Sequence, residues 1–100
     1  MIHVSWTYGF VVNDGKIFGL TDEVVEESFL GYEIGEVTYY SDIEGSYSGN
    51  FSNELPVGTL YFTIQGIAPE EAIAVKKDGF YVKATYGGEY SGGREKSSIQ

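Results

Sequence analysis

Carboxylates are the side chains of this sequence best suited to chemistry. Asp42-Ile43-Glu44-Gly45 and Asn13-Asp14-Gly15 are two short acidic stretches that also contain glycine. Their hard oxygen ligands suit Ca²⁺, although neither stretch has the spacing of an EF-hand loop. Asp, Asn and Gly also recur in turns for backbone reasons alone. Asp42 and Glu44 are therefore candidate metal ligands, with ordinary polar turns as the alternative.

Other catalytic arrangements find little support in the sequence. The chain has no cysteine, which excludes disulfides, thiolate catalysis and Cys-based metal sites. The one histidine, His3, has no accompanying nucleophile-elbow serine. Glycoside hydrolysis would need two acids across a cleft, and a chain of this size offers little cleft. A small metal-assisted enzyme would draw on Glu36, Asp42 or Glu44. We assign no catalytic residue and no cofactor, and the enzyme or calcium-binding domain is the alternative function.

Aromatic side chains are the more distinctive feature. They make up 16% of the chain, and nine are tyrosines. Adjacent pairs such as Tyr39-Tyr40 point to opposite faces of a strand, so one ring of each pair faces outward or meets a second layer. An exposed row of such rings could bind a sugar, a peptide or another subunit. The rings we predict to be exposed for binding are Trp6, Tyr8, Tyr39, Tyr61 and Tyr81.

Residues 57–86 are expected to form the frame that positions these side chains. They contain three apolar runs, at 60–67, 72–76 and 80–86, rich in aromatic and β-branched residues as half-buried strands require. Lys77-Asp78-Gly79 separates the last two runs, and Asp-Gly between strands is a strong hairpin signal because Gly accepts a positive φ. We therefore expect a three-stranded antiparallel unit.

The remaining segments add strands to this frame. Alternate apolar residues around an Asn-Asp-Gly turn predict a hairpin over 4–20, whose apolar side chains should share one interior with those of 57–86. A strand is predicted at 34–40, and a polar loop at 41–54 with a short strand at 46–51. Thr21 as N-cap and acids in the first turn favour a short helix at 22–30, which would cover the second face of the sheet. One helical turn is predicted at 68–71.

These elements predict a mostly β fold with a minor helical part. We expect an antiparallel curved sheet or a partly open barrel of about six strands, with one short helix. Residues 1–86 form the single globular domain in this prediction. Residues 87–100 lack periodicity and are glycine-rich, so we expect a flexible C-terminal tail.

The charge distribution limits the partners. The formal net charge is −9, and the interval between Lys16 and Lys76 holds eleven acids and no Lys or Arg. A nucleic-acid-binding protein needs a basic track to displace counterions, so no nucleic-acid partner is expected. No apolar run approaches the ~20 residues of a membrane-spanning helix. No export signal is recognisable, and the location is left open between the cytoplasm and the cell envelope.

The second half of the chain resembles a small uncharacterised domain of Bacillus and related Gram-positive bacteria, found in lipoprotein-like hypothetical proteins. The resemblance rests on Pro56-Val57-Gly58-Thr59 before a strand, Ile64-Gln65-Gly66, Glu71-Ala72-Ile73-Ala74-Val75, and Asp78-Gly79-Phe80-Tyr81. Ile34-Gly35-Glu36-Val37 also fits, so the likeness covers residues 34–86. These motifs are structural, and no functional residue is transferred. The resemblance implies a Gram-positive source and surroundings that include the cell envelope.

The sequence thus favours a non-enzymatic interaction or accessory module of a Gram-positive bacterium. Its expected partner is a protein or peptide, and a homodimer formed through a sheet edge is a further alternative. Exposed aromatic rings without converging polar groups would favour the module, whereas a cleft holding two acids would favour the enzyme.

Overall fold

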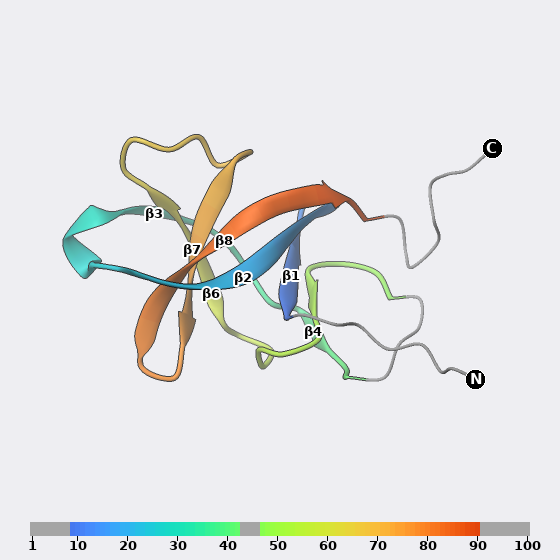
Figure 1. The fold of residues 1–100 in the computed structure, drawn as a ribbon. Helices are drawn as coiled ribbons and strands as arrows, with labels where there is room; N and C mark the ends of the chain where they lie inside the picture. The colour runs from blue at the N-terminus through green and yellow to red at the C-terminus, as the bar shows by residue number, and fades with distance from the viewer. Residues whose placement is uncertain (1–8, 43–46, 91–100) are drawn as a thin grey trace.

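The computed structural model describes residues 9–42 and 47–90, which form one sheet of eight strands curled into an open half-barrel (Figure 1). The predicted mostly β fold is confirmed, with eight strands rather than about six. Their order across the sheet is β3-β6-β7-β8-β2-β1-β5-β4. Their bounds are β1 Phe10–Asn13, β2 Lys16–Val25, β3 Leu30–Glu36, β4 Tyr39–Tyr40, β5 Phe51–Ser52, β6 Leu60–Ile64, β7 Ala72–Lys77 and β8 Phe80–Glu89.

The predicted frame is present as the antiparallel strands β6, β7 and β8. The β7–β8 hairpin turns at Asp78 and Gly79, with φ angles of 53° and 87°. Two consecutive positive φ angles are those of the primed turn that matches the twist of a hairpin. The β1–β2 hairpin turns in the same way at Asp14 and Gly15, with φ angles of 54° and 79°. Both Asp-Gly signals in the sequence therefore mark hairpins.

The long strands β2 and β8 run side by side, and an irregularity in β2 bends the sheet. Leu20 pairs with Ala84 and Val24 pairs with Val82, so β2 has extra residues between these pairs. Such a bulge increases the local twist of a sheet. The Thr21 Oγ1 donates a hydrogen bond of 2.8 Å to the Lys83 carbonyl oxygen inside this bulge, which holds the distorted strand against β8.

The two ends of the strand order are consecutive in the chain. Val37 and Thr38 connect β3 to β4, and their amides donate to the carbonyl oxygens of Thr59 (2.8 Å) and Asn50 (2.7 Å). The strand predicted at 34–40 is therefore divided between the end of β3, which pairs with β6, and the two-residue β4, which pairs with β5. This connection draws the margins of the sheet together and explains the half-barrel shape.

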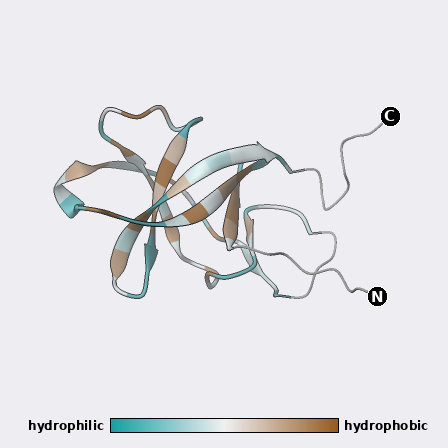
Figure 2. Cartoon of the chain, viewed as in Figure 1, coloured by the Kyte–Doolittle hydropathy of each residue, from teal (hydrophilic) through white to brown (hydrophobic). Residues whose placement is uncertain are grey.

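The interior follows the period of two along the strands. Ile73 and Val75 of β7 lie in one buried cluster with Val11, Phe18 and residues of β6 and β8, whereas Ala72 and Ala74 face a second cluster. Hydrophobic segments accordingly recur along β1, β2 and β7 (Figure 2). The prediction that residues of 4–20 and 57–86 share one interior is confirmed for the described residues.

The helix predicted at 22–30 is wrong. Residues up to Val25 continue β2, and only Glu27–Phe29 form a single 3-10 turn. Val24 and Val25 are β-branched and pair with β8, and this pairing outweighs the weak helical signal of the acidic residues. Within the described residues, no helix covers the second face of the sheet.

Several predicted boundaries also change. The short strand predicted at 46–51 is Phe51–Ser52, residues 69–71 form a turn, and β8 continues past the predicted boundary at residue 86 to Glu89. Residues 4–8 of the first predicted strand and residues 91–100 of the predicted tail lie outside the described residues. In the described part of the chain, no helix has the length and apolar character needed to cross a bilayer.

Candidate functional site

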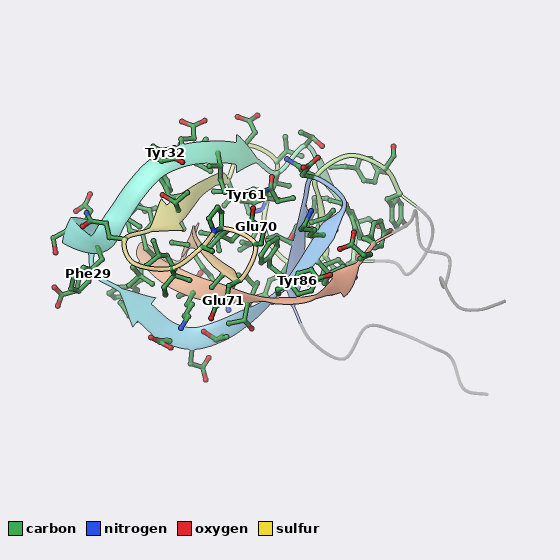
Figure 3. All side chains as sticks on the ribbon, turned by 90° about the horizontal axis from the view of Figure 1, so that it is seen from above. Phe29, Tyr32, Tyr61, Glu70, Glu71 and Tyr86 are labelled. Atoms are coloured by element: carbon green, nitrogen blue, oxygen red, sulfur yellow. The ribbon has the colours of Figure 1, made fainter. Side chains whose placement is uncertain are left out.

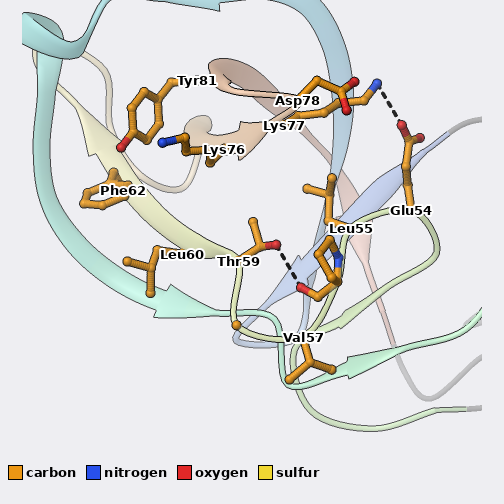
Figure 4. Close-up of a pocket in the computed structure, with 12 residues that line it drawn as sticks. Glu54, Leu55, Val57, Thr59, Leu60, Phe62, Lys76, Lys77, Asp78 and Tyr81 are labelled. Carbon is orange, nitrogen blue, oxygen red and sulfur yellow. Dashed lines mark hydrogen bonds and ion pairs between the residues drawn. The ribbon is translucent and has the colours of Figure 1, made fainter.

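A groove of about 700 Å³ lies between the outer face of strands β6–β8 and the loop that leads into β6 (Figure 4). One wall of the groove is formed by the strands, and the pairing of β7 with β8 places Lys76 directly opposite Tyr81. Leu60 and Phe62 occupy alternate positions of β6 and so share a face of that strand. The groove is lined by residues 54–60, Phe62, Lys76, Lys77, Asp78 and Tyr81.

A tight turn shapes the loop wall. The Thr59 amide and the Thr59 Oγ1 both donate to the Pro56 carbonyl oxygen, at 3.1 and 2.8 Å. Gly58 has a φ of 97°, the positive value that the third residue of a type II turn requires. The Gly58 amide donates to the Val37 carbonyl oxygen at 2.9 Å. The turn is therefore attached to the sheet, and it leaves the Val57 side chain 59% exposed.

The floor of the groove is aromatic and carries a cation. The rings of Phe62 and Tyr81 meet edge to face, with centroids 5.7 Å apart, a favourable geometry for aromatic pairs. The Lys76 Nζ lies 5.3 Å from the centroid of the Tyr81 ring, within the range of a cation–π interaction. Both rings are half-buried, so apolar surface is left for a ligand.

An ion pair closes one end of the groove. The Lys77 Nζ and a Glu54 carboxylate oxygen are 2.7 Å apart, and this hydrogen bond with Glu54 raises the pKa of Lys77. Both side chains are about one-third exposed, so solvent screens the pair and its contribution to stability is small. Its effect is to fix the position of the rim.

The predicted aromatic binding residues have different positions. Tyr81 lies in the groove. Tyr39 is 47% exposed, but its ring packs against those of Tyr47 and Phe51 near β5, away from the groove. Trp6 and Tyr8 lie outside the described residues.

The exposure predicted for Tyr61 is wrong. Its side chain is fully buried, in the middle of the half-barrel, whereas Tyr32 lies at the margin on β3 (Figure 3). The Tyr61 hydroxyl donates to the Val12 carbonyl oxygen at 2.9 Å, and burial raises the pKa of this hydroxyl. Tyr61 therefore links β6 to β1 and cannot contact a ligand. Of the adjacent pair Tyr61-Phe62, Phe62 is the ring that faces the groove.

Only two of the three acidic candidates, Glu36 and Asp42, are among the described residues. Asp42 is exposed and Glu36 is exposed on β3, while Glu44 lies outside the described residues. Within residues 9–42 and 47–90, no three His, Asp or Glu side chains gather as metal ligands would. Because Glu44 is not among the described residues, the predicted pair of Asp42 and Glu44 stays a prediction.

The groove contains residues that sequence reasoning did not select. Val57, Leu60 and Lys76 appear in the sequence as ordinary loop and strand residues. The signals that could have found them are the Pro-Val-Gly-Thr turn ahead of a strand and the alternation that places Leu60 with Phe62. The missing information was strand order, because β7 separates β6 from β8.

Comparisons of the chain with protein-family models, curated proteins and solved structures find no match. The resemblance of residues 34–86 to a domain of Bacillus and related bacteria thus stays a prediction. Function has to be inferred from the groove itself.

Proposed function

We propose that the protein is a non-enzymatic interaction module that binds an extended segment of a partner protein or peptide in the groove. The observation that carries this proposal is the half-buried aromatic floor of Phe62 and Tyr81 beside the exposed Val57. Apolar concave surface with a few polar groups at its rim is typical of binding sites. The ion pair of Lys77 and Glu54 supplies such a rim and holds it in place.

The groove is a better candidate than the aromatic cluster near β5. There the rings of Tyr47 and Phe51 stack with centroids 4.5 Å apart, and Tyr39 packs on both. The apolar surfaces of these rings are largely covered by one another, whereas the apolar surface in the groove stays accessible to a ligand. The resemblance of residues 34–86 supports an accessory module of a Gram-positive bacterium, in which such a groove would recognise another component of the same cell.

Binding to a display library of capped random peptides tests the proposal, with Val57→Glu as the groove variant. Burial of a valine side chain contributes about 1.5 kcal/mol or more, so the selected peptides should bind this variant at least about tenfold more weakly. Val24→Glu is the matched control, because Val24 is 56% exposed on β2 and does not line the groove.

The expected result is that fluorescence anisotropy shows weaker peptide binding for Val57→Glu and unchanged binding for Val24→Glu. Equal melting temperatures of the two variants would show that both remain folded. Peptides that bind Val57→Glu as tightly as the unmodified chain would contradict the proposal, as would a library that yields no binder.

A further inference from the structure

Lys76 is the groove lysine that has no ion-pair partner among the described residues. Among residues 9–42 and 47–90, no carboxylate lies within ion-pair distance of its Nζ. The neighbouring Lys77, by contrast, is paired with Glu54. In the close-up, the Lys76 Nζ points toward the rings of Phe62 and Tyr81 and away from that pair (Figure 4). A ligand on the aromatic floor therefore meets one free ammonium group.

The surrounding charge distinguishes this position from the rest of the molecule. The chain as a whole carries a net charge of −9, but Lys76 and Lys77 are on the groove wall and balance its two acids, Glu54 and Asp78. The groove is thus a locally neutral region in which a carboxylate is not repelled at short range. Basic residues elsewhere in the same ligand would be attracted by the acidic remainder of the surface.

We propose that the groove selects an extended segment in which an Asp or Glu side chain stands next to an apolar or aromatic one, an inference that rests on the proposed function. The apolar side chain packs on Phe62 and Tyr81, and the carboxylate pairs with Lys76. Residues flanking this pair are neutral or basic, as the net charge of the protein requires.

The carboxylate belongs to a side chain rather than to a chain terminus. Terminal carboxylates are usually held by several free backbone amides. The loop wall does not offer them, since the Gly58 amide donates to Val37 and the Thr59 amide donates to Pro56. A single flexible ammonium group suits a side-chain carboxylate, which it meets as a point charge.

A capped peptide library tests this selectivity, with three varied positions in a host of Gly and Lys, an acetylated N-terminus and an amidated C-terminus. Pools with Asp or Glu next to Phe, Leu or Ile should bind about fivefold more tightly than pools with Gln or Asn there, as for a partly exposed ion pair. Lys76→Gln should abolish this preference, and Lys76→Glu should replace it with a preference for Lys and Arg. Lys83→Gln is the matched control, because Lys83 lies on β8 outside the groove and faces Glu23 at 3.7 Å.

The outcomes separate the inference from the proposed function. Pools that bind and are weakened by Val57→Glu, but show no preference for acids, would overturn the inference and leave the binding groove intact. A preference for acids that survives Lys76→Gln would also overturn it. Failure of every pool to bind would contradict both.

Discussion

At the scale of single residues, Tyr61 and Tyr81 show how one residue type acquires opposite roles. Tyr61 is fully buried and donates to the Val12 carbonyl oxygen, whereas Tyr81 is half-buried and lines the groove. Tyrosine suits both settings because it has an apolar ring and a polar hydroxyl. Whether a tyrosine becomes a core residue or a groove residue depends on which face of the sheet its strand position occupies.

The Tyr61 hydroxyl makes a testable contribution to stability. Tyr61→Phe leaves the Val12 carbonyl oxygen without its buried donor and should lower the free energy of unfolding by about 1–2 kcal/mol. Tyr32→Phe is the control: Tyr32 is 71% exposed, so its variant should stay within about 0.5 kcal/mol. Urea unfolding at pH 7 measures both changes.

The pH dependence of the same variant gives an independent readout. Burial raises the pKa of folded Tyr61 above the value of about 10 expected in the unfolded chain. Its contribution is therefore fully present below about pH 10 and is lost as the pH rises further, because the unfolded state releases the proton first. Urea unfolding between pH 8 and pH 11 should show a shallower alkaline decline for Tyr61→Phe than for Tyr32→Phe. Parallel declines would contradict the assignment.

At the scale of elements, local turn chemistry predicts the hairpins, but pairing decides the rest. Asp78-Gly79 and Asp14-Gly15 are recognisable because a primed turn restricts which residues fit. The conformation of residues 22–25 cannot be recognised in this way, because acids beside two valines suit either the start of a helix or an exposed strand. Only the pairing of Val24 and Val25 with β8 selects the strand. The groove cannot be predicted from the sequence either, because it forms only where the loop at 54–59 meets the distant strands β7 and β8.

The open edge of the sheet bears on self-association. β3 is the terminal strand of the described sheet, and it carries the exposed acids Glu33 and Glu36. An antiparallel pair of two β3 strands centred on Glu33 would place the two Glu33 side chains opposite each other. Directly opposed like charges destabilise a sheet, and charges on edge strands are a common protection against pairing. This arrangement argues against a homodimer formed through β3.

The turn that shapes the groove should be sensitive to one substitution. Gly58 has a φ of 97°, and nothing lies within 4 Å of the position a Cβ would take there, so Gly58→Ala introduces backbone strain without a clash. It should lower the free energy of unfolding by about 1–2 kcal/mol. In Gly19→Ala, a Cβ would meet the Thr85 carbonyl oxygen at an ordinary 4.0 Å, and the φ is not in the left-handed region. This control should be neutral or slightly stabilising, and comparable losses in urea unfolding would contradict the turn assignment.

At the scale of the whole molecule, the structure combines an acidic exterior with a small, locally neutral and partly apolar groove. The net charge of −9 opposes self-association by mutual repulsion and favours partners that are basic around their contact residues. Because exposed charges are screened by salt, association should slow as ionic strength rises. The apolar contacts with Phe62 and Tyr81 should be affected much less.

The central claim is that a partner segment binds in the groove. The most direct measurement is amide chemical-shift mapping by NMR, with the full ¹⁵N-labelled chain titrated with the tightest capped library peptide. We predict that the largest shifts fall on the amides of residues 54, 55 and 57–60 and of Lys76 and Tyr81, and that these shifts are lost in Val57→Glu. Largest shifts at Tyr39 and Phe51 near β5, or along the open edge of β3, would contradict the claim.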